Sequence, residues 1–215
     1  IKGDYLFAGV DKNSNKQISK FVPRLTAMYD LSETLKLRGS FAQGYRAPQA
    51  FDEDLHTEVL DGEPIFVELD KDLSSETSNS YSASLNYTQR EGNTQANLIF
   101  EGFYTRINDR FINQDLTDIG NIKHKIKTNA SDLLNIMGAN IEANFAFGSQ
   151  WVSQTEFTYQ QSRFTKEQTI WENEDATSPK KVTSDRVMRS PDLYGYTTLS
   201  YNPIAALKLS YNGVF

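Results

Sequence analysis

The sequence predicts an all-β fold, an antiparallel up-and-down meander of about nine strands, and three observations support that prediction. Polar and apolar residues alternate with a period of two, as in Tyr81–Tyr87, which reads Tyr-Ser-Ala-Ser-Leu-Asn-Tyr. Because side chains on a strand point alternately to opposite faces, each such segment has one apolar and one polar face. The joints between segments are alternately short and long, which is typical of strands that run between two different rims. No apolar run approaches the roughly 18 residues of a membrane-spanning helix.

The expected strands share this alternation. In order they span 5–10, 21–29, 35–41, 78–89, 94–107 (with a possible extension to 113), 137–147, 151–164, 192–201, and a ninth segment from Leu207. Short turns are expected at Ser32-Glu33, Glu91–Asn93, Gly148-Ser149 and Asn202-Pro203, where Gly, Asn and Pro favour chain reversal. Long loops are expected at 11–17, 43–76, 114–134 and 165–190.

Composition narrows the classes of protein. The chain has 215 residues, a formal net charge of -6, no cysteine and a hydrophobic fraction of 38%. That fraction is low for a globular domain and fits a barrel with a polar interior. The acidic balance argues against nucleic acid as a partner. The lack of cysteine excludes a disulfide scaffold and a thiolate metal site.

A long series of two-faced strands predicts part of a large transmembrane β-barrel, with lipid on one side and water on the other. Aromatic residues beside the short turns are typical of a girdle at the headgroup level, and they are Tyr29, Tyr87, Phe145, Phe147, Trp151 and Tyr201. The alternation places one set of side chains on the lipid side: Leu85, Phe100, Tyr104, Phe145, Phe157, Leu199 and Leu209. It places another set on the opposite side: Ser84, Glu101, Asn144, Glu156 and Lys208.

Several motifs resemble a known family. Residues 37–48, Leu-Arg-Gly-Ser-Phe-Ala-Gln-Gly-Tyr-Arg-Ala-Pro, resemble a strand-and-loop segment of TonB-dependent outer-membrane receptors, and 49–56 look like its Bacteroidetes form. Residues 73–81, 103–109 and 137–142 resemble later segments of the same family, although Ser75 stands where proline is usual and Ala139-Asn140 departs from Gly-Val-Glu. The resemblance implies a 22-stranded barrel with a plugged lumen. Residues 1–215 would be a late portion of it, without the plug domain, the TonB box or the remaining strands.

The resemblance also implies a function. A receptor of this family takes up a scarce nutrient, such as an iron chelate, cobalamin or a glycan, across the outer membrane of a Gram-negative cell with energy coupled through TonB. Its partners would be outer-membrane lipid, its own plug domain and through it TonB, the small nutrient ligand and a surface lipoprotein. No cofactor is expected. Two alternatives remain: a soluble all-β carbohydrate- or ligand-binding module, and an enzyme on a smaller outer-membrane barrel.

Candidate substrate-binding residues lie in the expected long loops, and they are Arg46, Asp52, Glu53, Asp54, His56 and Trp171. Arg46 could contact a ligand, or it could pair with acidic residues of the lumen. The acidic cluster could hold a hard cation, but it lacks the regular spacing of a calcium loop and reads more simply as a solvated loop. Trp171 could stack on a sugar or an aromatic ligand, or anchor its own loop. No catalytic arrangement stands out, and neither an enzyme nor a metal site is predicted.

Overall fold

The computed structural model describes residues 20–48, 65–117, 123–173, 180–188 and 190–215. All the secondary-structure elements within these ranges are β-strands. None of the described segments is a helix that is long and apolar enough to cross a membrane. The expected first strand at 5–10 and the loop at 11–17 lie outside the described residues.

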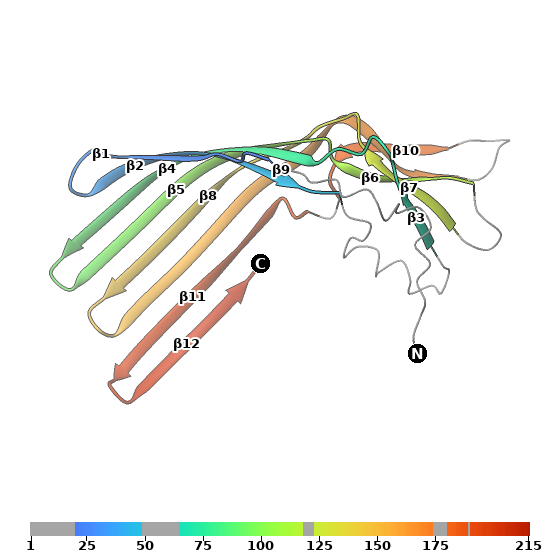
Figure 1. Ribbon diagram of the computed structural model, residues 1–215. Helices are drawn as coiled ribbons and strands as arrows, with labels where there is room; N and C mark the ends of the chain where they lie inside the picture. Colours follow the sequence, from blue (N-terminus) through green and yellow to red (C-terminus); the bar gives the residue numbers. More distant parts are fainter. Residues whose placement is uncertain (1–19, 49–64, 118–122, 174–179, 189) are drawn as a thin grey trace, which may run out of the picture. The chain divides into compact units, whose positions relative to one another are not determined.

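A large, mostly antiparallel sheet contains nine strands (Figure 1). Eight of them follow one another in the order β1-β2-β4-β5-β8-β9-β11-β12, and β10 pairs with β9 beside this path. Their bounds are β1 (Arg24–Asp30), β2 (Leu35–Arg46), β4 (Glu76–Glu91), β5 (Thr94–Asn108), β8 (Leu134–Phe147), β9 (Trp151–Glu172), β10 (Lys181–Arg186), β11 (Leu193–Ile204) and β12 (Leu207–Val214). The all-β, up-and-down prediction is confirmed for this part of the chain.

Short connections join the strands in pairs, and their residues explain why the chain reverses there. Gly92 and Gly148 have φ values of +54° and +58°, which glycine adopts without strain. In the first turn the backbone N–H groups of Thr34 and Leu35 donate to the Ser32 hydroxyl at 3.2 and 3.1 Å. These three short turns lie where the sequence predicts them.

The fourth short turn differs from the prediction. The chain reverses at residues 205–206, and Asn202-Pro203 lies inside β11, where the pairing with β12 shifts between Tyr201 and Ile204. The Asn202 N–H donates to the carbonyl of Gln150 at 2.8 Å. Pro203 has no N–H to donate, so it interrupts the ladder without reversing the chain.

The two faces of the large sheet differ as predicted. The register places Ile141 opposite Phe157 on one face, and Glu142 opposite Glu156 on the other. Farther along the sheet, a hydrogen bond joins Ser80 and Thr105. With the remaining pairings, all residues expected on the lipid side share one face, here called the apolar face: Leu85, Phe100, Tyr104, Phe145, Phe157, Leu199 and Leu209. The residues expected opposite share the other, here called the polar face: Ser84, Glu101, Asn144, Glu156 and Lys208.

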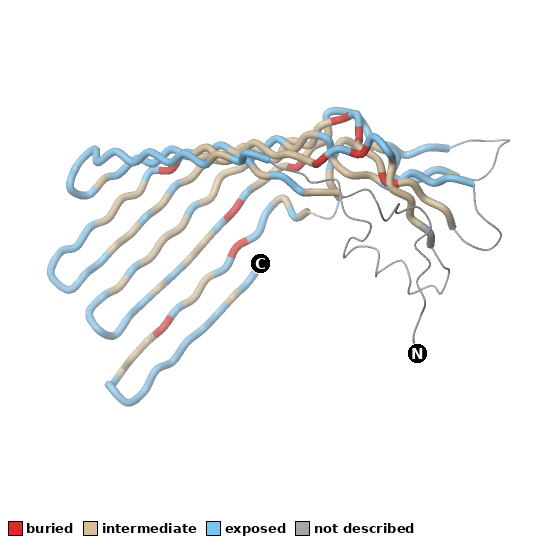
Figure 2. The backbone as a smooth tube through the Cα atoms, viewed as in Figure 1, coloured by how far each residue is buried: buried red, intermediate tan, exposed pale blue. Residues whose placement is uncertain are grey.

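Most residues of the large sheet are intermediate or exposed, and few are buried (Figure 2). Burial on this sheet is inverted relative to a soluble protein. On the apolar face Phe100 is 54% exposed and Ile141 is 49% exposed, whereas Thr158 on the polar face is 4% exposed. Among the described residues, the apolar side chains that are buried are Leu73 and Ala130. The large sheet therefore has no apolar core of its own, and its apolar residues face outward.

A second, smaller sheet takes two of its three strands, β3 and β7, from segments that the sequence assigns to loops. It contains β3 (Ile65–Leu69), β6 (Phe111–Asp115) and β7 (Lys123–Asn129), in the order β3-β7-β6. β3 pairs with β7 in parallel, and β6 pairs with β7 antiparallel. The expected loops at 43–76 and 114–134 are thus wrong in part. Pairing between β3 and β7 joins segments far apart in sequence, which a local alternation of residues cannot reveal.

Two further boundaries also differ. The expected extension of the fifth strand to 113 is broken, because β5 ends at Asn108 and β6 begins at Phe111. The expected loop at 165–190 contains the end of β9 and all of β10. Most of its strand residues are polar, and the apolar Ile170 and Trp171 are adjacent rather than alternating, so the two-residue alternation is lost there although the backbone remains paired.

The chain divides into two compact units, and each is described by itself. One includes Gly44–Thr77 and Ile107–Leu133 and so holds the small sheet. The other consists of Pro23–Gln43, Ser78–Arg106 and Leu134–Phe215 and holds most of the large sheet.

Candidate ligand-binding region

Arg46 is the predicted site residue whose surroundings are best defined. It ends β2, and its guanidinium lies 3.3 Å from the carboxylate of Glu76, the first residue of β4. The same carboxylate oxygen accepts the backbone N–H of Phe111 at 3.2 Å, and the guanidinium carbon lies 4.8 Å from the centre of the Phe111 ring. A carboxylate and an aromatic face therefore hold the cation in place. The Arg46 side chain is 50% exposed, so a ligand could still reach it.

Other charged side chains make contacts within the unit that holds the small sheet. The Arg110 guanidinium donates to both carboxylate oxygens of Asp132, at 3.0 and 3.3 Å. Lys127 on β7 is 1% exposed, and its ammonium lies 6.0 Å from the Phe111 ring centre. Lysine is rarely buried to this degree, and partners are normally required to compensate for it. These residues are better explained as supports for the loops than as ligand contacts.

Asn129 joins three parts of this unit. Its carboxamide oxygen accepts the Ser74 N–H at 2.8 Å, and its Nδ2 donates to the carbonyls of Asp109 at 2.6 Å and of Ser74 at 3.1 Å. Asp109 has a φ of +53°, a left-handed conformation that is uncommon outside glycine. The turn at Asp109 ends β5 and redirects the chain into β6, which explains why the expected continuous strand is broken.

His124 lies in the same unit and has a structural role. Its Nε2 is 3.5 Å from a carboxylate oxygen of Glu68, which precedes Leu69 at the end of β3. The two residues bridge the parallel strands β3 and β7. No group of three or more metal-ligating side chains occurs among the residues that the structure describes.

Trp171 lies near the end of β9, where the sequence predicts a loop. It pairs with Val182 on β10, and its side chain is 52% exposed. The register then moves to Thr169 opposite Thr183, so Ile170 is an extra residue that forms a β-bulge. The end of β9, residues 165–172, and β10 are here called the arm. Beyond the pair of Trp171 and Val182, the Lys180 N–H donates to the Asn173 carboxamide oxygen at 2.6 Å. The arm presents an aromatic ring to solvent on a paired backbone, which suits stacking on a flat ligand.

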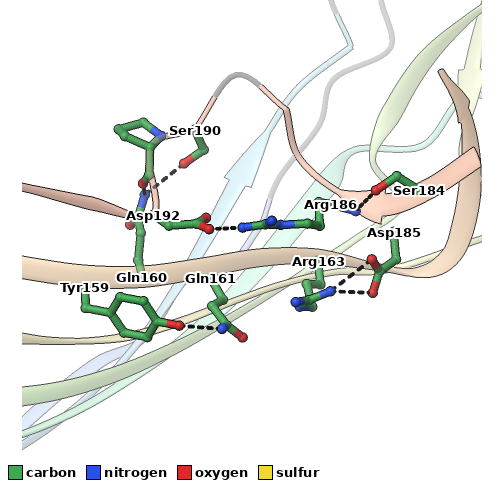
Figure 3. Close-up of polar contacts among 10 residues, drawn as sticks. Tyr159, Gln160, Gln161, Arg163, Ser184, Asp185, Arg186, Ser190 and Asp192 are labelled. Atoms are coloured by element: carbon green, nitrogen blue, oxygen red, sulfur yellow. Dashed lines mark hydrogen bonds and ion pairs between the residues drawn. The ribbon is translucent and has the colours of Figure 1, made fainter. Parts of the chain in front are cut away.

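Two ion pairs join β10 to its neighbours in the large sheet (Figure 3). The Arg163 Nη1 lies 2.9 Å from both carboxylate oxygens of Asp185. Arg186 pairs with Asp192, the residue before β11. The two ion pairs therefore hold β10 to β9 and to the residue that precedes β11.

The polar face forms a continuous wall of hydrogen-bonding side chains. Hydroxyl pairs cross between strands, as in Ser40 with Ser82 at 2.8 Å and Ser200 with Ser210 at 3.1 Å. Three glutamates lie on this face: Glu101, Glu142 and Glu156. Such a wall suits contact with water and polar solutes, and we find no nucleophile arranged with a base on it within the described part of the chain.

The structure locates only some of the predicted site residues. Arg46 and Trp171 belong to different units, and Asp52, Glu53, Asp54 and His56 lie outside the described residues. Sequence reasoning missed the partners of Arg46, namely Glu76 and Phe111. Their separation from it in sequence, 30 and 65 positions, leaves no local signal.

This architecture is shared with a known family of proteins. The family model described as TonB dependent receptor-like, beta-barrel matches residues 2–214. Among curated proteins, none matches this sequence. The FrpB iron transporter from Neisseria meningitidis (F3-3 variant) is similar in structure, with a TM-score of 0.57 and 16% identity over 90% of this chain and 26% of that chain.

Two other solved structures resemble the chain to the same degree. The hemophore receptor HasR of Serratia marcescens, solved with its hemophore HasA and heme, has a TM-score of 0.63 and 13% identity over 90% of this chain and 32% of that one. The siderophore receptor PirA from Pseudomonas aeruginosa has a TM-score of 0.57 and 13% identity over 90% of this chain and 34% of that one. The chain thus spans about a third or less of these chains, and at these identities the likeness shows the fold alone. With the family match over nearly all its length, the chain belongs to the TonB-dependent receptor-like β-barrel family.

Proposed function

We propose that this chain, as a member of the TonB-dependent receptor-like β-barrel family, forms part of the wall of an outer-membrane receptor that takes up a scarce nutrient. The observation that carries the proposal is the inversion of burial in the large sheet. Its apolar face is exposed while its polar face is hydrogen-bonded from strand to strand. Lipid on one side and water on the other are the two environments that these faces require.

The two alternatives fit this inversion less well. A soluble sandwich would cover its apolar face with a second sheet, whereas here large apolar side chains of that face are about half exposed. A barrel enzyme would need catalytic side chains, and the described residues offer no nucleophile paired with a base. The first observation disfavours the soluble module, and the second favours a receptor or transporter over an enzyme.

The parent protein would supply what this segment lacks. Since the chain spans 26% to 34% of the three solved chains compared above, we propose that it is a portion of a larger barrel. The resemblance of its motifs to later segments of the family suggests a late portion. The proposed partners are outer-membrane lipid, a plug domain within the lumen, TonB acting through that plug, and a surface lipoprotein. The motif at 49–56 suggests a Bacteroidetes-like receptor, located in the outer membrane of a Gram-negative cell.

The proposed ligand contacts lie in two places. Arg46, held by Glu76 and Phe111, offers a half-exposed cation to an anionic group of the nutrient. Trp171 offers an exposed ring to a flat or sugar-like group. Further proposed ligand contacts, outside the described residues, are Asp52, Glu53, Asp54 and His56. An iron chelate, cobalamin and a glycan are the nutrient classes proposed.

Uptake by the full-length protein tests the proposal. In cells, the protein should fractionate with the outer membrane, and its deletion should abolish growth when one of these nutrients is limiting. Loss of TonB should have the same effect as the deletion. A protein recovered in the soluble fraction, or a deletion strain that grows normally on each limiting nutrient, would contradict the proposal.

The role of Trp171 can be tested separately once the nutrient is identified. In the full-length receptor, Trp171→Ala should weaken ligand binding by about 2 kcal/mol if the ring is a stacked anchor. Ile170→Ala is the matched control, since this neighbour is also exposed and lies on the same arm. Equal affinities for Trp171→Ala and wild type by calorimetry would remove Trp171 from the binding site.

A further inference from the structure

A shallow hollow of about 780 Å³ lies on the apolar face of the large sheet. Its floor contains one small residue from each of four consecutive strands: Gly39 of β2, Ala83 of β4, Gly102 of β5 and Ala139 of β8. A Cβ placed at Gly39 or Gly102 would meet no atom within 4 Å. Since neighbouring strands lie about 4.8 Å apart, the floor extends about 14 Å across the sheet.

Large side chains border this floor on both sides and make it a groove. Toward the short turns the next outward residues are Leu37, Leu85, Phe100 and Ile141. Toward the opposite end they are Phe41, Tyr81, Tyr104 and Met137. The aromatic rings on that side form a row of neighbours. The ring centroids of Phe41 and Tyr81 are 5.1 Å apart, and those of Tyr81 and Tyr104 are 6.4 Å apart.

Beyond the tyrosines the apolar face becomes polar. Its next residues are Gln43, Asn79, Arg106, Asn135 and Arg163, here called the polar row. Gln43 donates to Asn79 at 2.7 Å, and the Tyr104 hydroxyl donates to Asn135 at 2.8 Å. Arg163 is paired with Asp185, whereas Arg106 is exposed two residues beyond Tyr104. The groove therefore runs just beneath the point where the apolar band ends, beside an excess of positive charge.

We infer that the groove binds one acyl chain of an anionic membrane lipid, with a phosphate of the headgroup on Arg106. The inference rests on the proposed location in the outer membrane. An acyl chain fills apolar surface that the small residues leave bare, and tyrosine hydroxyls suit the depth at which chain meets headgroup. The guanidinium of Arg106 can donate two parallel hydrogen bonds to a phosphate, which is the pairing that arginine favours.

Charge argues against a second copy of this chain as the occupant. A symmetric contact through the groove would bring Arg106 of each copy toward the other at the edge of the hydrocarbon region, where like charges repel strongly. An anionic lipid has the complementary charge. Within the apolar face, the groove is separated from the polar row by one line of side chains, Phe41, Tyr81, Tyr104 and Met137. The strands lead from the polar row into the long connections, which form the outer rim in barrels of this kind.

Lipid retention by the full-length receptor tests the inference. The purified protein in detergent is incubated with phosphorylated lipid A or with the same lipid stripped of its phosphates, and bound lipid is counted by native mass spectrometry. Gly102→Leu fills the groove where a Cβ meets open space, and Arg106→Gln removes the charge. Ala143→Leu is the matched control, because it enlarges a small residue of the same face outside the groove.

Wild type and Ala143→Leu should retain the phosphorylated lipid, and Arg106→Gln should weaken its retention about tenfold, toward that of the stripped lipid. Gly102→Leu should abolish retention of both. Equal retention by Gly102→Leu and wild type would overturn the inference, as would a dimer that Gly102→Leu dissociates. If the protein does not fractionate with the outer membrane, the proposed function fails as well. If it does and these variants still retain lipid, only the lipid site fails.

Discussion

The two faces of the large sheet are built on the same strands and have opposite chemistry. Leu85 and Phe100 are exposed on the apolar face, while the neighbouring residue Ser84 is 9% exposed on the polar face. A soluble protein would show the reverse. The difference shows that side chains of the polar face are held by hydrogen bonds within the sheet. The apolar side chains of the other face need an apolar environment outside the sheet.

Side-chain packing shows the same contrast. On the polar face, Asn97 donates to both Asn86 and Thr88, at 2.8 and 2.9 Å, so side chains bond across strands. On the apolar face, the positions of Gly39 and Gly102 open onto empty space. Substitutions at equivalent depths on the two faces should therefore have unequal consequences, and two pairs of variants test this.

The largest expected effect comes from placing a charge on each face at the same depth. Phe100→Arg puts a guanidinium in the middle of the apolar face and should destabilise the full-length barrel by about 2–4 kcal/mol in a bilayer. Glu101→Arg, one residue farther along β5, should cost far less because its side chain points to the polar side. Urea titration in phospholipid vesicles, followed by heat-modifiable gel migration, measures both. Equal losses would mean that the two faces do not meet different solvents.

A smaller effect is expected from adding a side chain to glycines of the two faces. A Cβ at Gly138 on the polar face would lie 2.3 Å from the carbonyl oxygen of Tyr159 and 2.7 Å from the Phe103 ring. Gly138→Val should therefore destabilise the barrel by about 1–3 kcal/mol, as overpacking does elsewhere. Gly102→Val, which meets open space, should stay within about 0.5 kcal/mol of wild type. The same urea titration compares them, and the reverse order would show that the apolar face is the more tightly packed.

The sequence predicts the large sheet well because each of its strands shows its two faces locally. Residues 78–89 alternate without interruption, and β4 extends from Glu76 to Glu91 around them. The small sheet could not be predicted in the same way. β7 reads Lys-His-Lys-Ile-Lys-Thr-Asn, with no apolar face, and its parallel partner β3 lies more than fifty residues earlier. Only long-range pairing makes these segments strands.

The candidate site shows a similar limit. Arg46 stands out in the sequence because it precedes Ala47-Pro48 at the end of a strand. The carboxylate and ring that hold it come from β4 and β6, and no spacing rule connects those positions. The groove likewise depends on the register between neighbouring strands. Gly39, Ala83, Gly102 and Ala139 are ordinary small residues until the pairing of four strands aligns them.

The smallest expected effect concerns the ion pair between Arg163 and Asp185, where the apolar face ends (Figure 3). Both carboxylate oxygens lie 2.9 Å from a single nitrogen, Nη1, so the pair is not a two-nitrogen fork. Both side chains are about 40% exposed, and water and salt screen their attraction. Asp185→Asn should therefore cost only about 0.2–1 kcal/mol, and the loss should vanish in about 1 M salt. A loss above 2 kcal/mol that persists in salt would show that the pair lies within the low-dielectric band, which would move the boundary of the apolar face beyond the polar row.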